Sequence, residues 1–511
     1  MSSPVLEVNS STLVLDERIS HRSYALAISD VTALALLTPF VLLLNGYHPF
    51  ADDAGIYVAG IRKMLDPSLF ITDANFVLAH TRFSIFSHIF AEGIRLSHIP
   101  LELGLLIAYL LSIFVFLLGC FRLSQRIFED VQLQWGATLF ASALFTLPVA
   151  ATSLWVMDPY VTARSFSTPL SLFALAACID RDWKRTTLWF IATVALHPLM
   201  AAYLAGLLAA YALVSRSRWR WLGITCVAVF ATAAVVYFAT RNASLPVGYT
   251  EAALTRTYFF LSFWHWYELL GLVVPLLMMI VAAYRTHNLV VRNLCHACIA
   301  TGGLAAAITA CFVHTSGSLF LARIQPLRSF QLIYLIGVLL LGAFLAVYLR
   351  GRRAVFGAAL LLATSFLMMA VQKQVYTASA HVEWPFSASR NPWQQAFLWV
   401  RANTPRNAVF ALDSDYTKVE SEDTQGFRAT AVRSVLVDEL KDGGVVAIFP
   451  ELAPRWKKQR DLERDLDHIS DSERIARLRS AGVTWVLLRA GSETQFNCPY
   501  HNIEVSVCRL P

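Results

Sequence analysis

Long apolar runs recur through the first three quarters of this sequence and limit the folds it can adopt. The chain has 511 residues, of which 56% are hydrophobic and 15% are charged. Runs of about 20 apolar residues cross a bilayer as helices, because backbone exposed to lipid must satisfy its own hydrogen bonds. The sequence therefore predicts a polytopic α-helical membrane protein. The expected spans are residues 24–44, 101–121, 135–150, 167–179, 221–240, 269–284, 294–313, 330–349 and 354–371.

The first apolar run is expected to remain as a span. It starts late, is long, and lacks the small-residue cleavage site of a signal peptide. The formal net charge is +7, but the lysines and arginines lie between the apolar runs and form no continuous basic stripe. This distribution is typical of topology signals and argues against a nucleic-acid partner.

Residues 186–214 are predicted to form a re-entrant hairpin. His197-Pro198 stands at the middle of this apolar stretch, and basic residues flank it on both sides. Cytoplasmic loops carry an excess of Lys and Arg, so both ends of the stretch should face the cytoplasm. A single kinked span is the alternative, and it would place every later basic cluster outside. The flanking basic residues are Arg181, Lys184, Arg185, Arg216, Arg218 and Arg220.

With the hairpin in place, the other basic loops agree on one orientation. They carry Arg18, Arg22, Arg122, Arg126, Arg285, Arg292, Arg350, Arg352 and Arg353. The predicted layout is a cytoplasmic segment 1–23, a transmembrane domain 24–371 with a long first external loop 45–100, and an extracytoplasmic domain 372–511.

The carboxyl-terminal part differs in composition, being polar and charged. Helical patterns (393–403, 472–481) and strand patterns (408–412, 434–438, 484–488, 503–508) mix there, which predicts a small α/β domain. Cys498 and Cys508 flank the last strand, and a disulfide between them would suit an oxidising exterior. Two cytoplasmic thiols would give the same pattern.

An acidic pair follows the first span. The loop after the first span carries two helical patterns, at 54–65 and 79–96. Asp52-Asp53 precedes the first of them, so the carboxylates would lie near the positive end of a helix and at the membrane surface. They could cap that helix, or they could act on a lipid headgroup.

Arginines on the expected outer side form the second candidate group. External loops are usually poor in arginine, yet Arg164, Arg256, Arg323 and Arg328 fall there. An arginine fork holds phosphate in bidentate fashion, so Arg323 and Arg328 suit a lipid-linked phosphate. Interfacial snorkelling of long cationic side chains is the alternative.

Other signals are weaker. His197 could reach a substrate, although a hydrogen-bonded buried histidine is the commoner case. Cys295 and Cys298 have zinc-like spacing without a second pair. Asp413 and Asp415 resemble an acidic D-x-D pair, and turn residues after a strand explain them equally well. The aromatic cluster of Trp264, Trp266 and Tyr267 is typical of an interfacial belt and could also stack on a sugar ring.

In layout the chain resembles the GT-C superfamily of integral-membrane glycosyltransferases. The resemblance rests on the acidic pair after the first span, the long first external loop with amphipathic helices, and the external carboxyl-terminal domain. Asp52-Asp53 followed by Tyr57 and Met64-Leu65 is similar to the Asp-Glu motif of bacterial lipid A aminoarabinose transferases and protein O-mannosyltransferases, with Asp in place of Glu. Residues 399–405 also resemble the start of the external domain in uncharacterised bacterial GT-C-like proteins.

This resemblance implies transfer of a sugar from a polyprenyl-phosphate donor to an acceptor on the outer face, with inversion. Asp52 would be the general base and Asp53 would orient the acceptor. Arg328 and Arg323 would neutralise the leaving phosphate. Arg256, Arg164, Asp158 and Tyr57 complete the expected substrate-binding set.

The expected partners are a lipid-linked sugar donor and membrane lipid, and the expected location is the bacterial cytoplasmic membrane. No nucleotide cofactor is needed, because the lipid-linked donor is already activated. Whether a divalent cation bridges Asp52 and the phosphate stays open, and so does the acceptor. Two other functions compete: a transporter or flippase built around the break at His197-Pro198, and a non-catalytic scaffold that displays the carboxyl-terminal domain.

Overall fold

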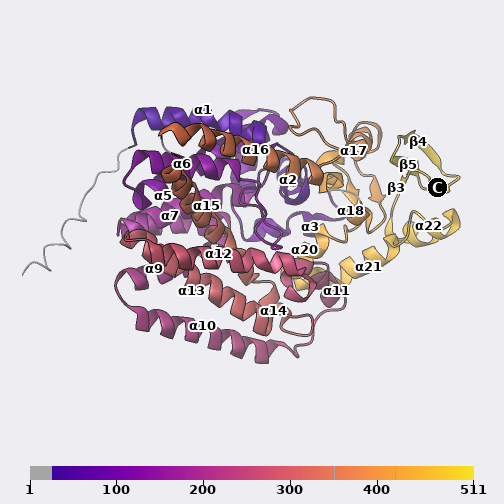
Figure 1. Cartoon of the computed structure of the whole chain (residues 1–511). Helices are drawn as coiled ribbons and strands as arrows, with labels where there is room; N and C mark the ends of the chain where they lie inside the picture. The colour runs from indigo at the N-terminus through magenta and orange to yellow at the C-terminus, as the bar shows by residue number, and fades with distance from the viewer. Residues whose placement is uncertain (1–25, 350, 420–421) are drawn as a thin grey trace, which may run out of the picture.

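The computed structural model of this chain describes residues 26–349, 351–419 and 422–511. Long helices form a bundle in which most axes run in one general direction, and the carboxyl-terminal domain sits at one end of that bundle (Figure 1). The predicted cytoplasmic segment 1–23, the start of the first span and Arg350 lie outside the described residues.

The predicted polytopic helical class is confirmed. Within the described residues, eight helical stretches are long and apolar enough to cross a membrane. They are α1 (Ile28–Asn45), α5 (Leu101–Ile127), α9 (Pro198–Ser215), α10 (Trp219–Thr240), α12 (Trp266–Arg285), α13 (Leu289–Phe312), Leu319–Tyr348, which contains α14 (Leu319–Ala322), η6 (Pro326–Ser329) and α15 (Phe330–Tyr348), and Gly351–Val375, which ends in α16 (Ala354–Val375).

Two predicted spans correspond to shorter helices. Helix α7 (Ala163–Ile179) has 17 residues and α6 (Val131–Ala143) has 13. The span predicted at 135–150 is wrong in its last part, because the chain leaves the helix after Ala143. Pro148 pairs with Trp155 in an isolated bridge of the loop that follows. Apolar composition alone does not reveal that a run ends in a folded loop.

The stretch predicted as a hairpin is broken where expected. Helix α8 (Trp183–Leu196) ends just before His197, and α9 begins at Pro198, which suits the first position of a helix. The His197 side chain caps α9 by accepting a hydrogen bond from the Met200 backbone N–H (3.4 Å).

The loop between α1 and α5 carries short helices that fold over one end of the bundle. They are α2 (Asp52–Leu65), α3 (Ala74–Val77), η3 (Ala79–Arg82) and α4 (Phe86–Ser97). The first predicted helix of this loop matches α2, whereas the second is split at residues 83–85 into η3 and α4. Between α10 and α12 lie α11 (Tyr249–Leu254), η4 (Thr257–Phe259) and η5 (Leu261–Phe263).

The carboxyl-terminal domain is built on a five-stranded mixed sheet with the order β2-β1-β3-β5-β4. The strands are β1 (Val409–Ala411), β2 (Ser434–Val435), β3 (Trp485–Arg489), β4 (Asn497–His501) and β5 (Val505–Arg509). The three strands β2, β1 and β3 are parallel, while β5 and β4 run antiparallel. Strand β4 was not predicted, because this polar edge strand contains Pro499 and lacks the apolar alternation of a half-buried strand.

Side chains alternate between the two faces of this sheet. Phe410 and Leu487 pack on one face with α17 (Pro392–Asn403), while Val486 and Leu488 pack on the other. The remaining helices are α18 (Tyr416–Val419), α19 (Phe427–Ala431), α20 (Lys441–Ile448), α21 (Ala453–Glu463) and α22 (Asp471–Leu478). The disulfide between Cys498 and Cys508 is formed.

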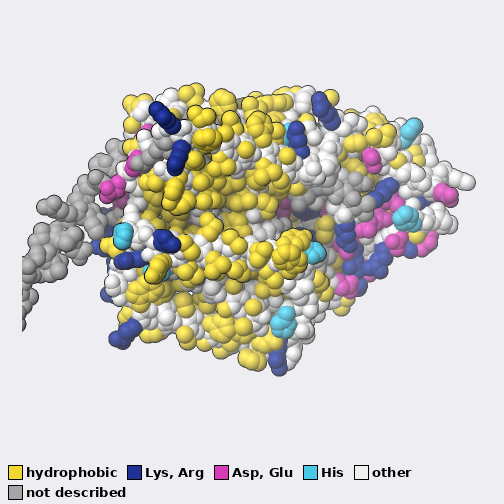
Figure 2. Space-filling model, in the orientation of Figure 1, with side chains coloured by type: hydrophobic (Ala, Val, Ile, Leu, Met, Phe, Trp, Pro, Cys, Tyr) yellow, Lys and Arg dark blue, Asp and Glu magenta, His cyan; other side chains and the backbone are white. Residues whose placement is uncertain are grey.

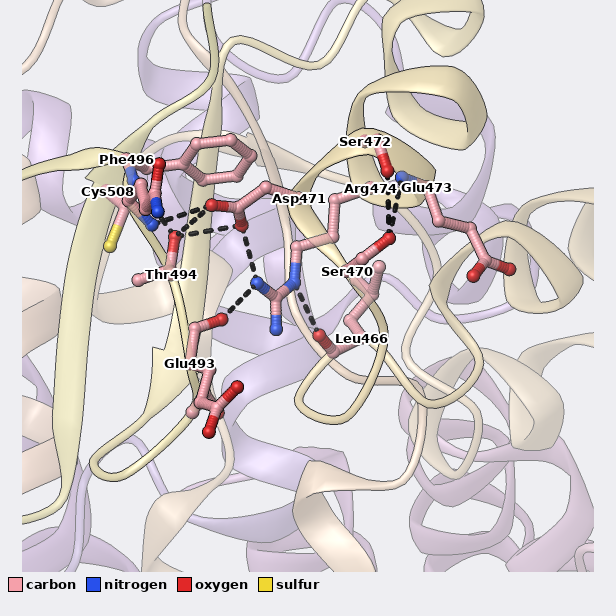
Figure 3. Close-up of polar contacts among 12 residues, drawn as sticks. Leu466, Ser470, Asp471, Ser472, Glu473, Arg474, Glu493, Thr494, Phe496 and Cys508 are labelled. Carbon is pink, nitrogen blue, oxygen red and sulfur yellow. Dashed lines mark hydrogen bonds and ion pairs between the residues drawn. The ribbon is translucent and has the colours of Figure 1, made fainter.

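A fully buried arginine ties α22 to the loop before β4 (Figure 3). Arg474 donates to the Leu466 carbonyl (2.8 Å), to the Glu493 carbonyl (2.8 Å) and to Asp471 Oδ1 (2.6 Å). Asp471 in turn accepts from Thr494 Oγ1 (2.9 Å). A buried charge is tolerated only when it is paired and hydrogen-bonded in this way.

The surface differs between the two parts of the molecule. In Figure 2, hydrophobic side chains cover the face above α1, α12 and α16, whereas acidic and basic side chains gather on the carboxyl-terminal domain. An apolar belt over a helical bundle is what a lipid environment requires.

Candidate functional site

A cavity of about 590 Å³ lies where the bundle meets the carboxyl-terminal domain. Its walls come from α2, η3, the start of α9, the segments around η4 and η6, and α20. Segments far apart in the sequence therefore build one site. The charged side chains that line it are Asp53, Arg164, Arg256, Arg323, Arg328 and Lys441.

The acidic pair opens helix α2. Asp52 has a φ of +46°, in the left-handed region that aspartate tolerates better than most residues. This turn directs the two neighbouring carboxylates to different places. Asp53 lines the large cavity, whereas Asp52 lines an adjacent cavity of about 40 Å³ against the carboxyl-terminal domain.

Asp53 is held by a buried arginine. Its Oδ2 accepts from Arg164 Nη1 at 2.9 Å, and the same guanidinium pairs with the buried Asp158 at 3.0 Å. Burial alone would raise the pKa of Asp53, but the charges of Arg164, Arg328 and Arg256 hold that pKa below its usual value. Asp53 therefore faces the cavity as a carboxylate. Burial raises the pKa of Asp158, which lies farther from the cavity.

Asp52 has both carboxylate oxygens engaged. Tyr160 donates its hydroxyl to Oδ2 at 2.5 Å, and the Lys441 ammonium pairs with Oδ1. Lys441 Nζ also lies 3.9 Å from Asp53 Oδ1. The side chain of Asp52 is 14% exposed and that of Asp53 is 31% exposed, so Asp53 is the more accessible of the two.

Three arginines in the cavity wall have no carboxylate partner among the described residues. Arg256 and Arg323 donate to backbone carbonyls, of Leu440 and of Ile448 respectively. Arg328 donates to the Thr152 carbonyl (3.4 Å) and lies over the Tyr258 ring, 5.0 Å from its centroid. Guanidinium groups without a carboxylate partner favour an anionic ligand in the cavity, because a partly buried charge is costly when it is not paired.

The segment that carries Arg323 and Arg328 is fixed from α9. The Tyr203 hydroxyl contacts the carbonyls of Ile324 (2.6 Å) and Gln325 (2.9 Å), and Gln325 has a φ of +51°. This strained turn places both arginines on the same cavity wall.

Neutral polar atoms complete the lining. Gln325 Oε1 and His80 Nδ1 are buried and find no hydrogen-bond partner among the described residues. Burial lowers the pKa of His80 to about 4, so its imidazole is neutral, and burial raises the pKa of Tyr57 to about 12. Such atoms can hydrogen-bond an uncharged polar part of a ligand.

The structure brings together most of the residues singled out from the sequence. Asp53, Tyr57, Arg164, His197, Arg256, Arg323 and Arg328 all line the large cavity. Asp158 supports it through Arg164, whereas Asp52 lies beside it. Asp413 accepts from the backbone N–H groups of Asp415 (3.3 Å) and Asp467 (3.2 Å), as a turn residue would. Cys295 and Cys298 are buried in α13.

Sequence reasoning missed Lys441 and Tyr258 as members of the site. Lys441 lies in the carboxyl-terminal domain, far along the chain from the acidic pair. Only Gly443-Gly444, an unusual pair inside a helix, gives a local signal that this segment packs closely against another part of the chain, which is Thr255 and Arg256.

The residues around the acidic pair do not fit a metal ion well. Within the described ranges, no three His, Cys, Asp or Glu side chains are grouped so that they could hold one. The Lys441 amine instead lies next to both aspartates, and burial lowers its pKa to about 7.

No family model matches this sequence, and no curated protein matches it. Among solved structures, the chain is similar to the archaeal oligosaccharyltransferase AglB from Archaeoglobus fulgidus, in complex with an inhibitory peptide and a dolichol-phosphate. The alignment has 13% sequence identity and a TM-score of 0.39, and it covers 90% of this chain and 69% of that one.

Proposed function

We propose that this protein transfers a sugar from a polyprenyl-phosphate donor to an acceptor, as GT-C glycosyltransferases do. One observation carries this proposal. Three arginines without carboxylate partners and one ionised carboxylate, Asp53, converge on a single cavity at the end of a membrane helix bundle.

The arginines suit the phosphate of the donor. Guanidinium groups bind phosphate oxygens in bidentate fashion and stay charged beside lipid. They would also stabilise the negative charge that grows on the phosphate as it leaves. Phe320, Ile324 and Ile448 line the same cavity and are 43%, 39% and 39% exposed, which gives the prenyl chain an apolar exit.

The uncharged polar atoms suit the sugar. Gln325 Oε1 can accept a hydrogen bond from a hydroxyl, and the neutral His80 can accept or donate one. Both side chains line the cavity together with the arginines.

Asp53 is the proposed base, in place of Asp52 as inferred from the sequence. The acceptor oxygen forms a bond to the anomeric carbon while the bond from that carbon to the phosphate oxygen breaks. The polyprenyl phosphate leaves with the electron pair, and the acceptor proton passes to Asp53. A single displacement of this kind inverts the anomeric configuration. Arg164 holds the carboxylate in place for it.

We further propose that the cavity faces the outside of a bacterial cytoplasmic membrane. The distribution of basic residues in the connecting loops supports an amino terminus inside and a carboxyl-terminal domain outside. The Cys498–Cys508 disulfide suits an oxidising compartment.

A lipid-phosphate translocator is the second candidate, because His197, at the break between α8 and α9, lines the same cavity. Mass spectrometry of surface glycans and glycolipids, with and without the gene, tests both functions. If the protein is a transferase, its loss removes a sugar from one glycan, and the lipid-linked donor accumulates. If it is a translocator, its loss leaves the donor on one side of the membrane, and all products of that donor decrease together. An unchanged glycan profile contradicts both functions.

A further inference from the structure

Helix α20 of the carboxyl-terminal domain lies against the charged wall of the large cavity. Lys441, Gly444 and Ile448 all line that cavity. The carbonyl of Leu440, just before the helix, accepts from Arg256 Nη2, and the carbonyl of Ile448, at the end of the helix, accepts from Arg323 Nη1 at 3.3 Å. Two of the three unpaired arginines are therefore oriented by the two ends of one short helix.

Two consecutive glycines let α20 come this close. A Cβ atom on Gly444 would lie 3.1 Å from Arg256 Nη1, and one on Gly443 would lie 2.8 Å from Thr255 Oγ1. A glycine inside a helix costs about 1 kcal/mol relative to alanine. Glycine is needed at both positions, because a side chain at Gly444 would displace the Arg256 guanidinium and one at Gly443 would press on Thr255.

The first residue of α20 engages the acidic pair. Lys441 pairs with Asp52 Oδ1, while Tyr160 takes the other oxygen. Both oxygens of Asp52 are thus engaged, and the neighbouring Asp53, not Asp52, lines the large cavity.

We propose that α20 is a positioning element of the catalytic site, so that the carboxyl-terminal domain and the membrane bundle form one active centre. Gly444 would set the position of Arg256 for the donor phosphate. Lys441 would hold Asp52, and through it the turn at the start of α2 that presents Asp53 to the acceptor. This inference rests on the proposed function. It assigns donor binding to Gly444 and presentation of the base to the acceptor to Lys441.

Binding of a lipid phosphate tests the role of Gly444 without requiring turnover. The probe is farnesyl phosphate, with farnesol as the ligand without phosphate, added to the full-length protein in nanodiscs. Gly444→Ala and Gly444→Leu should weaken farnesyl phosphate binding progressively, by tenfold or more for Leu, because a charge-assisted contact is lost. Farnesol binding should not change.

Gly223 provides the matched control. It also lies inside a helix, α10, and nothing lies within 4 Å of a Cβ atom placed on it. Gly223→Ala and Gly223→Leu should bind farnesyl phosphate as the wild type does. If folded Gly444 variants also bind it like the wild type, α20 does not position the arginines. If Gly444→Leu fails to fold, Gly444→Ala alone decides.

Kinetics test the role of Lys441. Lys441→Met should lower kcat by tenfold or more and leave the donor KM within about twofold, because small displacements of a catalytic group have large effects on rate. Lys441→Arg should restore part of kcat. Gly444→Ala should instead raise the donor KM. Lys457, which pairs with Glu251 at 2.8 Å outside the cavity, is the control lysine, and Lys457→Met should change neither constant.

The outcomes separate the two proposals. If the wild-type protein transfers no sugar from any lipid-linked donor, the proposed function is overturned. The role of α20 is still decided by how the Gly444 and Gly223 variants rank in farnesyl phosphate binding. An active wild type whose Lys441→Met variant keeps its kcat overturns the role of Lys441.

Discussion

At the scale of single residues, substitutions of Arg328 can separate the contribution of its charge to donor binding from that of its guanidinium geometry. Its guanidinium lies over the Tyr258 ring and carries no carboxylate partner among the described residues. Arg328→Ala should raise the donor KM by about 10- to 100-fold, since hydrogen bonds to charged groups contribute about 1.5–3 kcal/mol. Arg328→Lys should recover only part of this, because lysine keeps the charge but loses the fork. Equal losses in both variants would mean that geometry alone matters.

The position of Lys441 beside the two aspartates leads to a prediction about metal ions. Because the Lys441 amine already occupies the place next to both carboxylates, turnover should not depend on an added divalent cation. Sugar transfer by protein pretreated with EDTA should therefore equal that of untreated protein. Loss of transfer on chelation, restored by Mg²⁺ or Mn²⁺, would show that Lys441 moves aside for a cation.

The sequence was informative about residue types at this site and less so about their arrangement. Arg256, Arg323 and Arg328 could be singled out from the sequence, because arginines are unusual in the loops that were expected to lie outside. The choice between Asp52 and Asp53 could not be made from the sequence, because it depends on one left-handed turn and on Tyr160 and Lys441, which arrive from other parts of the chain.

At the scale of elements, the carboxyl-terminal domain carries a partly buried acid, Asp438, in the loop after β2, and this acid should make the stability of the domain depend on pH. Burial, followed by the charge of Asp442, raises the pKa of Asp438 to about 6. An aspartate in an unfolded chain has a pKa of about 3.9. Between these values the folded state binds more protons than the unfolded state, so stability falls as pH rises through about 4 to 6.

Thermal unfolding of the whole protein in detergent, followed through the signal of this domain, measures the effect. The unfolding temperature should be higher at pH 5 than at pH 7, and Asp438→Asn should reduce that difference by an amount corresponding to about 1 kcal/mol. An identical pH dependence in the wild type and in Asp438→Asn would contradict the raised pKa of this carboxyl group.

Secondary structure followed from the sequence where one signal dominated. The spans of α5, α13 and α15 are long, apolar and bounded by polar residues, and the break before α9 follows from His197-Pro198. The end of α6, the split between η3 and α4, and edge strand β4 were missed. In each case tertiary packing, and not local composition, determines where the element ends.

At the scale of the whole molecule, the orientation in the membrane can be measured by cysteine labelling. Ser217, between α9 and α10, and Ser480, in the carboxyl-terminal domain, are both exposed. In a variant whose exposed Cys311 is replaced by serine, Ser480→Cys should react with an impermeant maleimide in intact cells. Ser217→Cys should react only after permeabilisation, because its basic neighbours place it inside. The opposite pattern would invert the proposed topology.

The two-part organisation, a helical membrane bundle followed by an α/β domain, could be predicted from composition and periodicity. The dependence of the site on both parts could not, because Lys441 and the carbonyls of Leu440 and Ile448 reach the cavity only through long-range packing. When residues far apart in the sequence form one site, no motif with a fixed spacing reveals it.

The central claim is that Asp53 acts beside guanidinium groups that bind a lipid-linked phosphate. The direct measurement is release of polyprenyl phosphate from labelled polyprenyl-phosphate sugars by purified protein, with envelope extract as the source of acceptor. Asp53→Asn should lower the rate by about 10²- to 10⁴-fold with an unchanged donor affinity. Asp53→Asn protein that folds, binds the donor and releases polyprenyl phosphate at the wild-type rate would contradict the account.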